Sequence, residues 1–248
     1  MKILVCISSV PDTTSKINFT ADKSAFDKNG IQWVINPLDE FGLTKAIKLQ
    51  ESAGATVTVI NVGDASTEPV IRKSLAIGAN DAIRINVEPK DSFSVAKEIA
   101  NIAQSGGYDL ILCGKESIDY NGGAVPGMVA QLLNQPFVNA CVGLEVNGAE
   151  ATAVREIEGG KETISVKLPA VIAGQKGMVD EKDLIIPNMR GIMSARTKPL
   201  TVNEPINNEV KVDAVSFDAV PARAAVKMVA PDNLDELVRL LHEEAKVI

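Results

Sequence analysis

LILCGKESIDYNGGAVPGMVAQLL, residues 110–133, is the stretch that decides the fold. Residues 110–113 are apolar and predict a short buried strand, whereas residues 128–133 predict a helix. Residues 114–127 therefore form a glycine-rich strand-to-helix loop. Glycine lets the backbone approach a ligand closely, and free N–H groups in the first helical turn attract an anion such as phosphate. Neither a Walker motif nor a G-x-G-x-x-G motif is present, so an ordinary βα turn remains the alternative on these residues alone.

Strands and helices alternate on the N-terminal side of this loop. We expect strands at residues 2–8, 55–62, 81–86 and 110–113, and helices at residues 36–51, 68–77 and 92–104. Asn36 as N-cap, Pro37 at the first helical position and the acidic residues Asp39 and Glu40 mark one helix start. The alternation is typical of βαβ units, so we predict an α/β fold with a doubly wound, mostly parallel sheet. Ligands of such sheets bind at the carboxyl ends of the strands, where the loops after Ser8, Val62 and Cys113 fall.

The second half of the chain has a different pattern. Residues 144–167 are rich in β-forming residues separated by glycine turns, which predicts an antiparallel extension, and residues 168–173 predict another strand. Residues 174–205 are polar and show no period, so we expect a long loop with a function. The tail is extended as far as a closing helix that starts at Pro231, and it has too few apolar groups to fold alone. The predicted domains are residues 1–205 and an arm at residues 206–248.

The composition excludes several classes of function. The 248-residue chain has a net charge of −7 and a pI near 4.9, which argues against nucleic acid or an anionic membrane surface as the partner. Its apolar runs are far shorter than the ~20 residues of a membrane span, so we expect no membrane insertion and a cytoplasmic location. Cys6, Cys113 and Cys141 fit reduced, packed thiols and form no C-x-x-C motif. His242 is the only histidine, so redox chemistry would need a bound cofactor.

A family resemblance becomes visible at residues 153–173. AVREIEGGKETI at residues 153–164, followed by LPAVIA at residues 168–173, resembles the signature segment of electron transfer flavoprotein β subunits. Further matching segments follow in the order of that family, so the resemblance covers nearly the whole chain. These segments are residues 36–40, Gly114-Lys115 with Ile118-Asp119, residues 191–199 and the closing helix.

The resemblance implies an electron carrier rather than an enzyme. It implies a heterodimer with an α subunit, and an FAD that α mainly holds near the subunit interface. The arm at residues 206–248 would contact the α subunit. The fold implied for the β subunit is similar to that of adenine-nucleotide α-hydrolases, with a bound AMP of structural role. Electrons would arrive from flavin dehydrogenases, such as the acyl-CoA dehydrogenases of fatty acid oxidation. They would leave to a quinone oxidoreductase or a similar acceptor.

The resemblance also implies a set of residues for the AMP site. By position these are Cys6, Asn36, Val62, Gly63, Gly114, Ser117, Asp119, Asn121, Gly122, Gly123, Ala124 and Val125. The phosphate would be held by backbone N–H groups of residues 122–125, which agrees with the expectation for a helix N-terminus. Some members have a threonine at the position of Val125, so this chain has one side-chain donor fewer and depends more on its amides.

Other positions match residues near the flavin or the electron donor. Thr13 and Leu38 stand where relatives have flavin-contacting aromatic rings, and Glu156 matches a glutamate near the subunit interface. Arg155 is either the partner of Glu156 or a surface charge of the hairpin. Residues 174–200 correspond to a recognition loop with Met189 at the position of its docking leucine. The alternative is that Met189 and Met193 pack on their own domain.

Two other functions stay open. Some relatives bifurcate electrons and bind a second FAD in place of AMP, but those carry an Asp-Thr-Ala-Gln-like run where this chain has residues 120–125, which favours AMP. A stand-alone nucleotide-binding or hydrolysing domain would explain the sheet and the loop. It would not explain the signature segment, the long loop or the arm.

Overall fold

Strands and helices alternate in the structure, a computed structural model that describes residues 1–206, 209–223 and 225–248. The strands are β1 (Lys2–Cys6), β2 (Ser9–Pro11), β3 (Trp33–Ile35), β4 (Thr56–Val62), β5 (Asp81–Ile85), β6 (Leu110–Gly114), β7 (Phe137–Asn147), β8 (Glu150–Ile157), β9 (Gly160–Lys167), β10 (Ala170–Gly174) and β11 (Leu200–Asn203). The helices are α1 (Pro37–Ala53), α2 (Glu68–Ile77), α3 (Ser92–Gly106), α4 (Val125–Leu133), α5 (Met189–Ala195) and α6 (Leu234–Arg239). Single turns are η1 (Ala65–Thr67), η2 (Glu181–Asp183) and η3 (Leu240–Glu244). None of the described helices is long and apolar enough to span a membrane.

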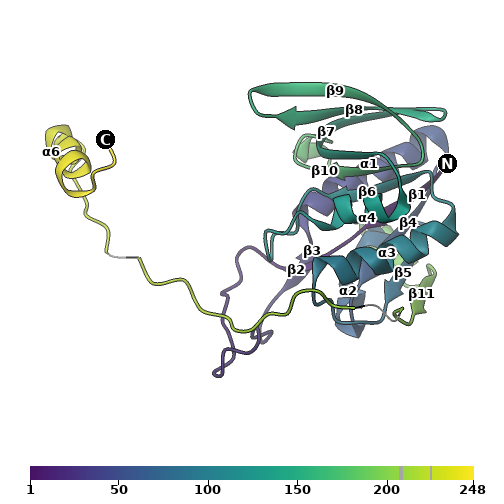
Figure 1. The fold of residues 1–248 in the computed structure, drawn as a ribbon, viewed down its shortest axis with the longest axis horizontal. Coiled ribbons are helices and arrows are strands. Elements are labelled where there is room, and N and C mark those ends of the chain that lie inside the picture. The colour runs from purple at the N-terminus through teal and green to yellow at the C-terminus, as the bar shows by residue number, and fades with distance from the viewer. Residues whose placement is uncertain (207–208, 224) are drawn as a thin grey trace. The chain divides into compact units, whose positions relative to one another are not determined.

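A nine-stranded sheet in the order β11-β5-β4-β1-β6-β10-β7-β8-β9 is the centre of the fold (Figure 1). Every neighbouring pair from β11 to β7 is parallel, and β8 is antiparallel to both of its neighbours, β7 and β9. A separate two-stranded sheet joins β2 to β3. The predicted mostly parallel sheet with an antiparallel extension is therefore confirmed.

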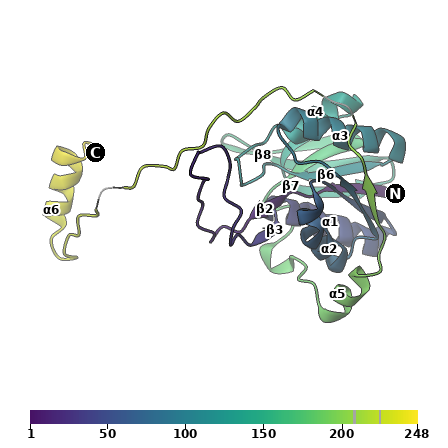
Figure 2. The ribbon, with the colours of Figure 1, turned by 90° about the horizontal axis from the view of Figure 1, so that it is seen from below.

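Helices cover both faces of the sheet, as a doubly wound fold requires (Figure 2). Along β1, Ile3 and Val5 join a core cluster with α1 and α2, whereas Leu4 and Cys6 join a second cluster with α3 and α4. Successive strand residues point to opposite faces, so each face receives every second residue. A strand covered on both sides needs a continuous apolar run, which is the pattern of residues 3–7.

The prediction of a long loop without regular structure at residues 174–205 is wrong. This segment contains η2, α5 and β11, and β11 pairs with β5 at the edge of the sheet. Long side chains hold it in place. Arg72 Nη1 donates to the carbonyl oxygens of Ala195 and Lys198 at 2.9 Å each, and Lys198 Nζ donates to Leu75 O at 2.9 Å and to Ala79 O at 2.6 Å. Elements this short present too few residues to establish a period.

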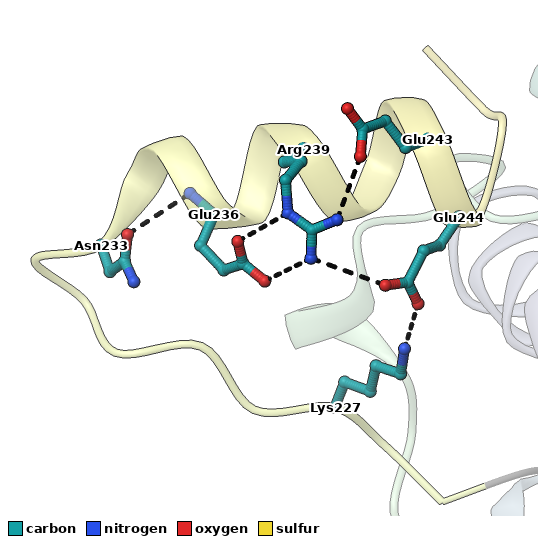
Figure 3. A network of polar contacts seen from close by, with 6 residues as sticks. All are labelled: Lys227, Asn233, Glu236, Arg239, Glu243 and Glu244. Carbon is teal, nitrogen blue, oxygen red and sulfur yellow. Dashed lines mark hydrogen bonds and ion pairs between the residues drawn. The ribbon is translucent and has the colours of Figure 1, made fainter.

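The chain divides into two compact units. The first comprises Met1–Ile17 and Asp27–Val215 and contains the sheet, and the second comprises Asn18–Phe26 and Ser216–Ile248. Within the second unit the rings of Phe19 and Phe217 stack with centroids 5.4 Å apart. Its closing helix carries a charged network around Arg239 (Figure 3), which hydrogen-bonds Glu236 at 2.7 and 2.8 Å and Glu243 at 3.0 Å. Lys227 pairs with Glu244 in the same network.

Candidate functional site

The strand order of the sheet reverses between β1 and β6. The chain runs from β1 outward to β4 and β5, and α3 then returns it to β6 on the other side of β1. Connections that leave in opposite directions open a crevice at the carboxyl ends of the two strands. The loops after β1, β4 and β6 meet at this edge, as expected, and the start of α1 lies between them.

Asn36 stands at the N-cap position of α1, but its side chain makes no capping hydrogen bond. Its Nδ2 instead donates to Glu116 O at 2.9 Å, and its Oδ1 accepts from Ile118 N at 3.3 Å. The side chain is 1% exposed. The predicted capping role is therefore wrong in its chemistry, because both polar atoms of the amide are used to hold the loop after β6.

Asp39 joins the two strands on either side of the crevice. Its Oδ2 accepts from Ser8 N at 2.7 Å, and its Oδ1 accepts from Gly114 N at 2.9 Å. Asp39 is 4% exposed. Burial raises its pKa to about 7, although hydrogen bonds from Ser8, Asn36 and Gly114 lower it. The sequence indicated Asp39 only as a first-turn acid, since nothing local shows that Ser8 and Gly114 are its neighbours.

The loop after β6 is shaped by its own polar groups. Ser117 and Gly122 exchange two backbone hydrogen bonds of 3.0 and 3.2 Å, and Asp119 Oδ1 accepts from Ser117 Oγ at 2.6 Å and Tyr120 N at 2.9 Å. Asn121 takes the left-handed conformation at φ +54°, which asparagine tolerates. Ser117 and Asp119 therefore fold the loop, and the N–H of Gly122, expected on a phosphate, is already donated to Ser117 O.

The start of α4 offers unpaired amides beside this loop. Ala124 stands at its N-cap without a side-chain cap. Among the described residues, no acceptor pairs with the N–H groups of Gly123, Ala124 or Val125. A Cβ built on Gly123 would lie 3.1 Å from Lys115 O, so the backbone turns tightly here. The residues present therefore fit a phosphate at three amides rather than the four expected.

The residues packed beneath the loops at this edge are apolar, and polar groups hold the end of β4. Cys6, Cys113, Val62 and Val125 belong to the core cluster on the α3 and α4 face. Gly63, just after β4, is held through both its N–H and its carbonyl group. Gly63 N donates to Ile85 O at 3.0 Å, and Arg84 Nη1 donates to Gly63 O at 3.0 Å. Asn61 on β4 also donates from Nδ2 to Ile7 O at 2.8 Å.

A hollow of about 500 Å³ adjoins the loop after β6. Its lining residues are Leu38, Lys115, Glu116, Glu156, Gln175, Lys176 and Gly177. It brings together Leu38 and Glu156, two of the positions matched to the flavin region, and Gln175 hydrogen-bonds Glu156. Arg155 pairs with Glu162 across β8 and β9 at 2.7 Å, so it is not the partner of Glu156. Thr13 is exposed, and it is not among the described residues that line the hollow.

Met189 and Met193 lie on α5 with 72% and 65% of their surface exposed. The alternative that both methionines pack on their own domain is therefore wrong. Gly191 between them faces α2 so closely that a Cβ would overlap Ala76 O. The helix is thus fixed on α2 by one side and presents its methionines on the other.

The comparisons with known proteins agree with one another. The sequence matches the family described as “Electron transfer flavoprotein domain” over residues 24–207. It is 33% identical to the electron transfer flavoprotein subunit beta of Bacillus subtilis, with 100% of both chains covered. The subunit beta of Syntrophomonas wolfei is 34% identical, with 91% of this chain and 88% of that one covered. The human subunit beta is 28% identical, with 100% and 99% covered.

Proposed function

This chain belongs to the electron transfer flavoprotein family as a β subunit, and from that premise we propose the reaction it serves. It pairs with an α subunit, receives electrons from flavin dehydrogenases such as acyl-CoA dehydrogenases, and passes them to a quinone oxidoreductase or a similar acceptor. The observation that carries the proposal is the match to β subunits over the full chain. FAD held mainly by the α subunit supplies the electron transfer, and the hollow with Leu38 and Glu156 is the part of this chain that faces it.

AMP in the crevice at the switch point is the second part of the proposal. Its phosphate is held by the amides of Gly123, Ala124 and Val125, where the partial positive charge of the helix N-terminus favours an anion. The loop that carries these amides is tied to α1 through Asn36. The nucleotide therefore stabilises the arrangement of loops and takes no part in electron transfer.

The decisive experiment is to co-express this chain with its α subunit and to identify the nucleotides released on denaturation. One FAD and one AMP per heterodimer are expected. Two FAD and no AMP would replace the proposal by the bifurcating form. ATP turnover by this chain without the α subunit would favour the stand-alone nucleotide-hydrolysing domain.

Gly123 provides a test of the amide site itself. Replacing it by valine places a side chain against Lys115 O, beside the unpaired amides, and should weaken AMP retention about tenfold or more, which equals ~1.4 kcal/mol. The matched control is Gly122→Ala, because a Cβ there meets nothing within 4 Å. Val125→Thr adds a hydroxyl donor and should keep or improve retention. Equal AMP content in the Gly123 and Gly122 variants would contradict the assignment.

Met189 is the proposed anchor for the electron donor. Methionine is flexible and polarisable, so it adapts to an apolar pocket on a partner. Met189→Glu should lower kcat/KM for the partner dehydrogenase about thirtyfold, the effect of losing an interface residue worth ~2 kcal/mol. Its unfolding free energy should stay within ~0.5 kcal/mol of the parent. Thr163→Glu adds the same charge at an exposed position of β9 and should leave the rate unchanged. A rate unaffected by Met189→Glu would remove this residue from the docking surface.

The arm is proposed to bind the α subunit through its closing helix. The network around Arg239 occupies one side of this helix (Figure 3), whereas Leu234, Leu237 and Val238 are 63%, 40% and 54% exposed. Leu234→Asp should weaken the α–β complex about tenfold or more, since apolar anchors dominate such interfaces. Asp235→Ala, in the same exposed turn, should have little effect. Sedimentation of the two variants with the α subunit measures the difference, and equal affinities would contradict the proposal.

A further inference from the structure

Two cysteines occupy neighbouring positions under the candidate nucleotide site. The register of β1 on β6 pairs Leu4 with Ile111 and Val5 with Leu112, so the next step along both strands sets Cys6 opposite Cys113. Residues in register on parallel neighbours point to the same face, and both cysteines join the cluster on the α3 and α4 face. Both are free thiols, with 8% and 4% of their surface exposed.

The spacing of the two strands suits a covalent bond between these thiols. Neighbouring strands lie about 4.7–4.9 Å apart, and disulfides join residues whose Cα atoms are about 4.4–6.8 Å apart. A hydrogen bond with Cys113, together with burial, raises the pKa of Cys6 well above its usual value. Cys6 is therefore held as a thiol at neutral pH, and its reaction with an oxidant should accelerate as the pH rises.

We propose that Cys6 and Cys113 are a redox modification site, which closes to an intramolecular disulfide by exchange with a small-molecule disulfide. One cysteine thiolate attacks the oxidant to give a mixed disulfide and releases one small thiol. The second cysteine then displaces the other small thiol and forms the bond between β1 and β6. The two cysteines lose two protons and two electrons, which leave with the oxidant as two thiols.

If AMP binds in the crevice, as the proposed function states, it lies over the two thiols and hinders their oxidation. Cys6 and Cys113 pack in one cluster with Val62 and Val125, which come from the loop ends that form the crevice. A nucleotide in the crevice would cover this cluster and would shield the thiols from the oxidant. Covalent closure at the switch point would in turn join the two strand ends that Asp39 holds by hydrogen bonds.

Cys141 serves as an internal control. It lies on β7 in the opposite core cluster, is 0% exposed, and its thiol donates to Gly143 O at 3.1 Å. It therefore has no cysteine partner among the described residues of its own cluster. Cys141→Ala should leave the reaction of the other two thiols unchanged.

The experiment treats the purified α–β heterodimer, first dialysed to remove bound nucleotide, with oxidised glutathione and maps the cysteines by mass spectrometry. A linked Cys6–Cys113 peptide is expected in the parent and in Cys141→Ala, and only a mixed disulfide in Cys113→Ala. Phenylarsine oxide bridges two adjacent thiols, so its binding to the parent protein tests the proximity of Cys6 and Cys113 without a variant. Absence of both the linked peptide and the arsenical bridge would overturn the inference.

Repeating the oxidation in the presence of AMP distinguishes a failure of the modification site from a failure of the proposed function. AMP at ten times its Kd should slow disulfide formation about tenfold, because only the free crevice reacts. A disulfide that forms equally fast with and without AMP would support the modification site and contradict the shielding by nucleotide. AMP release without any disulfide would support the proposed function and overturn the modification site.

Discussion

Gly114→Ala is expected to lower the free energy of unfolding by about 3–5 kcal/mol and to release the AMP that we propose for this crevice. A Cβ at this position would overlap Asp39 Oδ1 and lie 3.1 Å from both Asp39 N and Asn36 Nδ2. Asp39 cannot move aside, because the same carboxylate holds Ser8 N. Overpacking costs about 1–3 kcal/mol, and the loss of a hydrogen bond to a charged group adds about 1.5–3 kcal/mol.

Urea unfolding of the full-length chain measures this loss, and nucleotide analysis of the α–β complex measures the release. Gly42→Ala is the matched control, because this buried glycine of α1 has only Leu112 Cβ near its added atom, at 3.6 Å. That distance is an ordinary contact, so the control should unfold within ~1 kcal/mol of the parent. A Gly114→Ala variant as stable as the parent would contradict the prediction, because it would show that the hydrogen bond from Gly114 N to Asp39 Oδ1 does not contribute to stability.

The stability of the chain is expected to depend on pH through Asp39. Its pKa is raised from 3.8 to about 7 in the folded state, so the folded protein binds the proton more tightly than the unfolded chain does. The resulting stabilisation is fully present below pH ~4 and is lost as the pH rises to ~7, at about 1.4 kcal/mol per pH unit. Across that window the change is about 4 kcal/mol.

Asp39→Asn removes this titration and identifies its source. The free energy of unfolding of the parent minus that of the variant should fall between pH 5 and pH 7 and level off above pH 8. Asp91→Asn is the control, because the pKa of Asp91 is lowered to about 2 and its titration lies outside this range. A parent-to-variant difference that is flat from pH 5 to pH 8 for Asp39→Asn would contradict the assignment.

The fold was predictable where long apolar segments alternate. The bounds of α2, Glu68–Ile77, are those expected from the sequence. The parallel direction of β1, β4, β5 and β6 follows from the same alternation. The two short elements α5 and β11 were not predictable, because side chains of Arg72 and Lys198 hold them through backbone carbonyls.

The crevice was predictable in place but not in detail. Parallel strands and their loops follow from the pattern, so Cys6, Val62 and the loop after Gly114 were expected at one edge. The partner of each polar atom depends on which strands become neighbours, and Asp39 meets Gly114 across 75 residues of chain. For the same reason the sequence did not show that Gly122 donates its N–H within the loop, or that Arg155 pairs with Glu162.

The attachment of α5 to α2 has a consequence for the kinetics of partner recognition. A disordered docking segment would lose about 1–2 kcal/mol of backbone conformational entropy per residue when it becomes ordered on contact. The seven residues of α5 are already helical and are held by Arg72, Lys198 and the close approach of Gly191 to Ala76. The methionines are therefore preorganised, and under the docking role that we propose for Met189, encounter with a donor would need only the selection of side-chain rotamers rather than the folding of a loop.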